Sequence, residues 1–142
     1  MKHLLKLFTA FFISFTVLPI SNTFSDIIDD SNLTLARETL LKIPQMNDHF
    51  MNMNIEEYAA CAASVLIIVA AETNNTVVLN DEDQLYWGVI MAGTGLARQN
   101  LILMGHSDDL LQASISNKVS LSNDPSTPLI ALSECASYME KV

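Results

Sequence analysis

Fourteen consecutive uncharged residues, from Tyr58 to Ala71, lie between Glu57 and Glu72 in the middle of the chain. Such a run is apolar on every side of a helix, which predicts a helix buried inside other helices rather than one with a solvent face. It is also shorter than the roughly 20 residues that a membrane-spanning helix needs. Its many alanines allow neighbouring helices to approach closely. The rest of the chain must therefore supply enough helices to cover this segment.

Signals for helix starts and ends recur on both sides of this run, whereas no alternating, strand-like run of useful length occurs. Pro44 ends the first helix because proline disfavours helical geometry in the residue before it. Asn54 and Glu57 have the spacing of a capping box, and Gly105 is typical of a helix C-terminus. The expected helices run from Asp30 or Ser31 to Lys42, from Asn54 to Ala71, from Asn80 or Asp81 to about Gly105, from Ser107 to about Val119, and from Thr127, with Pro128 at its first position, to about Lys141.

These elements predict an all-α fold, a small antiparallel bundle of four to five helices with the Tyr58–Ala71 helix at its centre. Gly93 and Gly95 fall inside an expected helix, where each costs about 1 kcal/mol relative to alanine, which indicates close packing or a kink. On the outer helices we expect the core face to contain Leu33, Ala36, Leu40 and Leu41; Leu85, Val89, Ala92, Leu96 and Ile102–Leu103; Leu110, Leu111, Ile115 and Val119; and Leu129, Leu132, Ala136 and Met139.

The chain has two cysteines, Cys61 and Cys135, and each lies on the apolar stripe of its helix. An even number of cysteines in an exported chain indicates a disulfide rather than free thiols. We therefore predict one interhelical disulfide between Cys61 and Cys135. The alternative is a pair of separate buried thiols.

The first 25 residues resemble a secretory signal peptide. Lys2 and Lys6 give a positive start, the run from Leu7 to Ile20 is almost wholly apolar, and Thr23 and Ser25 are small residues before a cut at Asp26. We therefore expect residues 1–25 to be a signal peptide and residues 26–142 to form a single helical domain that is periplasmic or secreted. A retained membrane anchor is the alternative, but the apolar run is short for one.

The net negative charge of the chain disfavours some classes of binding partner. The whole chain carries 7 Lys and Arg against 16 Asp and Glu. Loss of Lys2 and Lys6 with the signal peptide leaves five basic residues and a formal charge of −11. Nucleic acid is an unfavourable partner because phosphate binding needs clustered cations, and an anionic membrane surface would repel the domain. A protein partner with a basic surface fits this charge, and so does simple solubility.

The stretch from Gln45 to Asn54 combines Met46, His49, Met51 and Met53, all of which could bind a soft metal such as Cu(I). Methionine also fills irregular gaps in a core. The sequence therefore leaves two interpretations of this stretch, a soft-metal site and a packed connection between two helices, and we assign no metal ligand or cofactor.

Tyr86 and Trp87 are the candidate partner contacts, because Trp87 lies off the expected core face and these residue types commonly anchor protein interfaces. A core role is the alternative. His106 beside Asp108 and Asp109 is a pattern that acid–base catalysis could use, but it is also typical of a solvated helix start. We identify no catalytic residue and do not expect an enzyme.

The function expected from these observations is that of an exported small helical binding module that engages a protein partner, with a profile like that of small inhibitors and immunity proteins. A soft-metal binding protein is the alternative. The sequence is also compatible with a homodimer.

Overall fold

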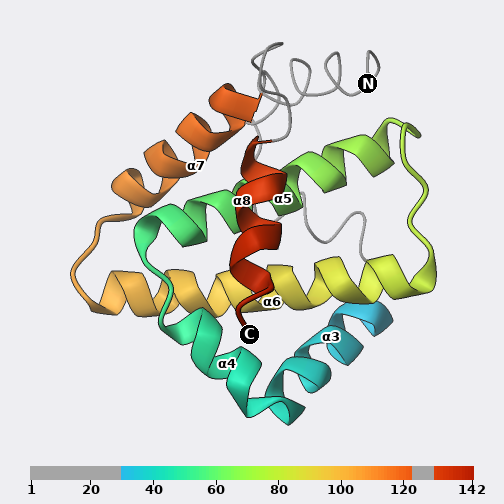
Figure 1. The fold of residues 1–142 in the computed structure, drawn as a ribbon, viewed down its shortest axis with the longest axis horizontal. Coiled ribbons are helices and arrows are strands. Elements are labelled where there is room, and N and C mark those ends of the chain that lie inside the picture. The colour runs from blue at the N-terminus through green and yellow to red at the C-terminus, as the bar shows by residue number, and fades with distance from the viewer. Residues whose placement is uncertain (1–29, 123–129) are drawn as a thin grey trace.

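The fold is all-α, as predicted (Figure 1). The structure is a computed structural model that describes residues 30–122 and 130–142, and this part of the chain contains helices without any strand. The described helices are α3 (Asp30–Lys42), α4 (Pro44–Met51), α5 (Ile55–Thr73), α6 (Asp81–Leu103), α7 (Asp108–Ser122) and α8 (Ile130–Met139). The expected signal peptide and the expected Thr127–Pro128 helix start lie outside the described residues, as do the side chains of Leu33 and Leu129.

Side chains cap three of the helices where the sequence predicted it. The Asn54 Oδ1 atom accepts from the Glu57 backbone N–H at 2.8 Å, and the Glu57 carboxylate accepts from the Asn54 N–H at 3.2 Å, which confirms the capping box of α5. Asn80 caps α6 by accepting from the Asp83 N–H at 2.8 Å. Ser107 accepts from the Leu110 N–H at 3.2 Å at the start of α7. These bonds satisfy backbone donors that would otherwise have no partner in the first turn.

The stretch between the first two expected helices is itself a helix, which was not predicted. Its interpretation as a packed connection is confirmed in one respect, since Phe50 and Met53 are buried and Met46 packs against the core. Pro44 does end α3, but it also stands in the first turn of α4. Proline is well tolerated there because the first helical N–H groups have no intrahelical acceptor. The described bundle therefore contains six helices instead of the expected four to five.

Helix α5 is the centre of the core, as its composition predicted. Most of its residues are buried, and it packs against α6, α7 and α8. Helix α6 runs in the opposite direction to α5 and also contacts α3 and α4. Helix α8 crosses over α5 in Figure 1. The largest fully buried side chains are Phe50, Leu66, Ile67, Ile90, Leu101, Leu111 and Ile115.

Several side chains expected in the core are exposed. Leu41 and Leu103 lie in the last turns of α3 and α6 and are largely exposed, and Ile102 is also exposed. Leu110 is exposed in the first turn of α7 whereas its neighbour Leu111 is fully buried, because adjacent helical residues point in different directions. Ala136 of α8 is exposed as well. A periodic pattern predicts the inner face of a helix but not where its covering neighbours end.

No single described helix is long and apolar enough to cross a membrane. Helices α4 and α5 reach the required length and composition only when taken together, as a pair bent by 112°.

Candidate partner-binding surface

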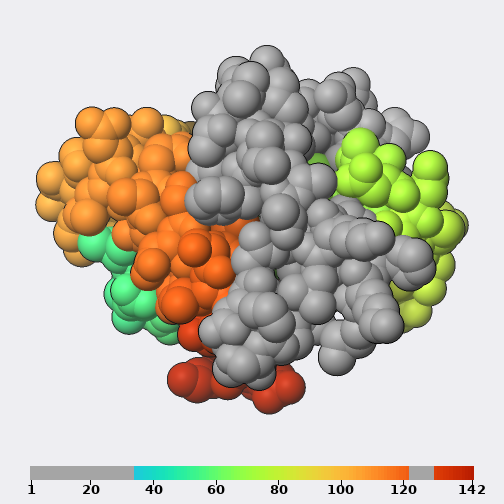
Figure 2. Space-filling model, turned by 90° about the horizontal axis from the view of Figure 1, so that it is seen from above, coloured from blue at the N-terminus to red at the C-terminus, as the bar shows by residue number. Residues whose placement is uncertain are grey.

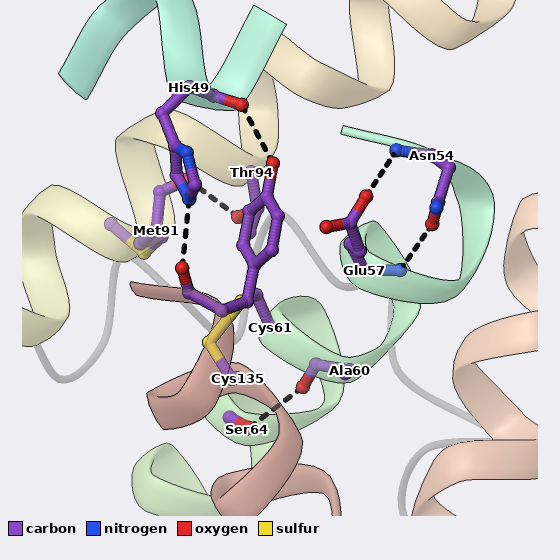
Figure 3. Close-up of a disulfide and its surroundings, with 10 residues drawn as sticks. His49, Asn54, Glu57, Ala60, Cys61, Ser64, Met91, Thr94 and Cys135 are labelled. Carbon is purple, nitrogen blue, oxygen red and sulfur yellow. Dashed lines mark hydrogen bonds between the residues drawn. A yellow bond between two sulfur atoms is a disulfide. The ribbon is translucent and has the colours of Figure 1, made fainter. Parts of the chain in front are cut away.

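The predicted disulfide joins Cys61 of α5 to Cys135 of α8, with the two Cα atoms 4.7 Å apart (Figure 3). Both cysteines are fully buried. The bridge therefore attaches the last described helix directly to the central one. Close to it, Ser64 donates a hydrogen bond to the Ala60 carbonyl at 2.7 Å, so this buried hydroxyl is satisfied within its own helix.

A second long-range link within the chain joins α4 to α8. The Tyr138 hydroxyl donates to the His49 carbonyl at 3.0 Å, and His49 Nε2 lies 3.1 Å from the Tyr138 carbonyl. Because a carbonyl only accepts, this His49 nitrogen carries the proton. The two rings are stacked with their centroids 3.9 Å apart. Two reciprocal hydrogen bonds and a ring contact therefore hold α4 against the C-terminal helix.

The pKa values of Tyr138 and Tyr58 provide a test of the burial of these two side chains. Burial, reinforced by the nearby Glu57 carboxylate, raises the pKa of Tyr138 to about 12. Burial also raises the pKa of Tyr58 to about 12, with Arg98 lowering it and Asp108 raising it. The unfolded chain releases these protons near pH 10, so stability should fall as the pH rises from 10 towards 12.

We expect an ultraviolet titration of the folded protein to show these two tyrosines ionising late and together with unfolding. The Tyr138→Phe variant should lose one late-titrating group and about 1 kcal/mol of stability, because one hydrogen bond is removed. Unfolded protein in urea is the control and should titrate with its ordinary tyrosine pKa. Early ionisation of two tyrosines in the folded protein would contradict the geometry.

The four candidate soft-metal ligands of the Met46–Met53 stretch differ in their surroundings. Met53 is buried in the core, Met46 packs against its edge, and Met51 is exposed. His49 uses Nε2 in the link to Tyr138. Among the described residues, no group of three or more histidine, cysteine, aspartate or glutamate side chains is arranged to hold a metal ion.

Lys118 is a buried cation that forms ion pairs with two exposed carboxylates. Its ammonium group lies 2.8 Å from a Glu134 carboxylate oxygen and 2.9 Å from one of Glu56. Burial lowers the pKa of Lys118, but the hydrogen bonds that its ammonium group donates to Glu134 and Glu56, together with their negative charge, outweigh this effect and raise the pKa overall. The network connects α5, α7 and α8 near the disulfide. It neutralises a cation that would otherwise be costly to bury.

Glu72, at the end of α5, is less well satisfied. Its Oε2 atom is buried without a hydrogen-bond partner in the part of the chain that the structure describes. Burial raises the pKa of this carboxyl group. The negative end of the α5 dipole lies at the same place, so nothing in its own helix favours the ionised form.

The predicted aromatic contacts lie early in α6. Tyr86 is 45% exposed, and its ring meets the Trp87 ring edge to face at a centroid distance of 5.2 Å. Trp87 is half-buried and packs against the core. The pair thus combines an exposed phenol ring with a half-buried indole ring. Its role in partner contact stays a prediction.

A second exposed apolar area, which the sequence analysis missed, lies at the other end of α6. Leu103 is 85% and Met104 is 66% exposed. Helix α4 ends beside this point, because the Asn100 side-chain amide donates to the Met51 carbonyl at 2.8 Å and lies 3.6 Å from the Met104 sulfur. Figures 1 and 2 both show the α4–α5 connection next to the α6–α7 connection. We call this area the α6-end surface and define it by its exposed apolar residues Met51, Leu103 and Met104.

His106 and Asp108 lie at the junction between α6 and α7, near this surface. Asp108 is paired with Arg98. His106 uses its backbone N–H to bond the Leu101 carbonyl at 3.1 Å, which closes the end of α6. This region is therefore organised as a helix end followed by a helix start.

Comparisons with protein-family models, with curated proteins and with solved structures gave no match to this chain. The surface chemistry of the domain is therefore the basis for a functional proposal.

Proposed function

We propose that this chain is an exported binding module: a small, acidic helical domain that engages a protein partner, as an inhibitor or immunity-type protein does. The observation that carries this proposal is the exposure of large apolar side chains on a domain whose core is otherwise closed. Leu103 and Met104, at the end of α6, are each more than 60% exposed. Exposed apolar patches on soluble domains commonly mark interaction sites.

Export is supported by the signal-like first 25 residues and by the buried Cys61–Cys135 disulfide, which is consistent with an oxidising compartment. The disulfide, the His49–Tyr138 link and the Lys118 network all fix helices to one another. A rigid scaffold of this kind loses little conformational entropy on binding. It suits recognition of a partner by surface contact.

Cell fractionation with photo-crosslinking tests the proposal. A photoreactive phenylalanine derivative is placed in turn at positions 86 and 103 of the full-length protein, and at position 82 as an exposed control. We expect the processed protein outside the cytosol and a discrete, saturable adduct from position 86 or 103 but not from position 82. A cytosolic, unprocessed protein, or no discrete adduct from any position, would contradict the proposal.

A further inference from the structure

We propose that the α6-end surface docks an amphipathic helical segment of the partner protein, one that carries lysine or arginine beside its apolar face. This inference rests on the proposed function and specifies the chemistry of the partner. It follows from three properties of the surface: fixed backbone, adaptable apolar side chains and a local excess of negative charge.

The backbone under the surface is held in place. Gly105 has a φ of 102°, a left-handed conformation that suits glycine, and it turns the chain from α6 towards α7. The N–H groups of Gly105 and His106 bond to the carbonyls of Ile102 and Leu101 at 3.0 and 3.1 Å. Asn100 ties the end of α4 to the same place. The exposed side chains therefore project from an ordered corner rather than from a loose loop.

The side chains themselves suit a helical ligand. Met51 and Met104 are unbranched and flexible, so they can adapt to the ridges of a bound helix, while Leu103 supplies the most exposed apolar contact. Amphipathic helices commonly bind by laying their apolar face on a surface of this kind.

Charge defines the rest of the ligand. The two segments that form the corner, residues 43–57 and 99–117, contain no lysine or arginine. They contain five acids: Asp48, Glu56, Glu57, Asp108 and Asp109. The cations next to these segments in the sequence already form ion pairs. Arg98 pairs with Asp108, and Lys118 pairs with Glu56 and Glu134. Asp48 and Asp109 take part in no ion pair among the described residues, so a basic segment complements this rim.

The same charge disfavours a second copy of the chain as the occupant. Two copies meeting at this corner would bring their acidic rims together, and each chain carries a net formal charge of −9. The surface is also separate from Tyr86, because Leu103 lies 17 positions further along α6, a rise of about 25 Å. Variants at the two places can therefore be compared independently.

The test uses the oxidised protein and three synthetic peptides: an amphipathic leucine–lysine helix, a scrambled isomer of the same composition, and a leucine–glutamate helix with the same spacing. Affinity is measured by fluorescence anisotropy, and the methyl NMR signals of Met51 and Met104 report the place of binding. The key variant is Leu103→Asp. Val78→Asp is the matched control, because Val78 is 87% exposed and lies in the connection before the opposite end of α6.

We expect the amphipathic cationic helix to bind at least about tenfold more tightly than its scrambled isomer and to shift the Met51 and Met104 methyl signals. Leu103→Asp should weaken binding by about tenfold or more, although it adds a negative charge that would favour a cationic ligand, because it removes an apolar contact. Val78→Asp adds the same charge and should leave the affinity within about twofold.

Equal binding of the scrambled isomer, unchanged methyl signals or full affinity in Leu103→Asp would overturn the inference. So would tighter binding of the leucine–glutamate helix. A concentration-dependent dimer that Leu103→Asp dissociates would assign the surface to a second copy and overturn it as well. If photo-crosslinking captures a partner that Leu103→Asp retains and Tyr86→Ala loses, the inference fails but the proposed function stands. If the peptide binds but no partner is captured in cells, the proposed function fails.

Discussion

Replacing Cys61 and Cys135 together by alanine should lower the free energy of unfolding by about 4 kcal/mol. The bridge joins residues that are 74 positions apart, and in the chain-entropy model a closed loop of this length restricts the unfolded chain by that amount. Small domains are usually stable by only about 5–15 kcal/mol. The disulfide is therefore expected to supply a large share of the stability, and urea unfolding followed by circular dichroism measures it.

The control is the unsubstituted protein in oxidised and reduced form, because this comparison changes the bridge but not the side chains. The reduced protein should show most of the loss, and the alanine variant should lose slightly more because it also leaves small cavities. Hydrogen exchange should show α8 losing protection first, since it is short and the bridge attaches it to α5. Equal unfolding midpoints for the oxidised and reduced protein would show that the bridge does not stabilise the fold.

Much of the helical fold could be predicted from sequence because its signals are local. The capping pair of Asn54 and Glu57, the Asn80 cap and the Gly105 stop each act within a few residues of a helix end. Helix α4 was missed because Pro44 was interpreted only as the end of α3, although proline in the first turn of a new helix has a known physical basis. The disulfide was predictable because each cysteine lay on an apolar stripe and the chain has only two.

The candidate surface depends on contacts that local patterns do not contain. The link between His49 and Tyr138 joins residues 89 positions apart and requires α4 and α8 to meet. Leu103 continues the apolar pattern of α6, yet it is 85% exposed. The glycine at position 93 predicted a close approach in general terms. Which side chain approaches it could be learned only from the fold.

Replacing Gly93 by alanine should destabilise the protein by about 1–3 kcal/mol, even though alanine is the better helix former. A Cβ atom at position 93 would lie 2.3 Å from two carbon atoms of the Phe50 ring and 2.5 Å from its Cγ. Because Cγ is close to the backbone, rotation of the ring cannot relieve this overlap. Phe50 is fully buried, so α4 would have to move away from α6.

Gly95 provides a matched control two residues further along the same helix. A Cβ atom there would meet no heavy atom within 4 Å. Gly95→Ala should therefore gain up to about 1 kcal/mol from helix propensity. Both variants are compared by urea unfolding, and an equal gain in both would show that α4 does not pack on Gly93 as described.

A second substitution separates steric overlap from any other effect of Gly93→Ala. Phe50→Leu alone should destabilise the core by leaving a cavity. Combined with Gly93→Ala it should cost less than the two single changes added together, because the smaller side chain makes room for the new methyl group. A double-mutant cycle measures this coupling. If the two changes in the free energy of unfolding were strictly additive, positions 50 and 93 would not be in contact. That result would contradict the packing of α4 on α6.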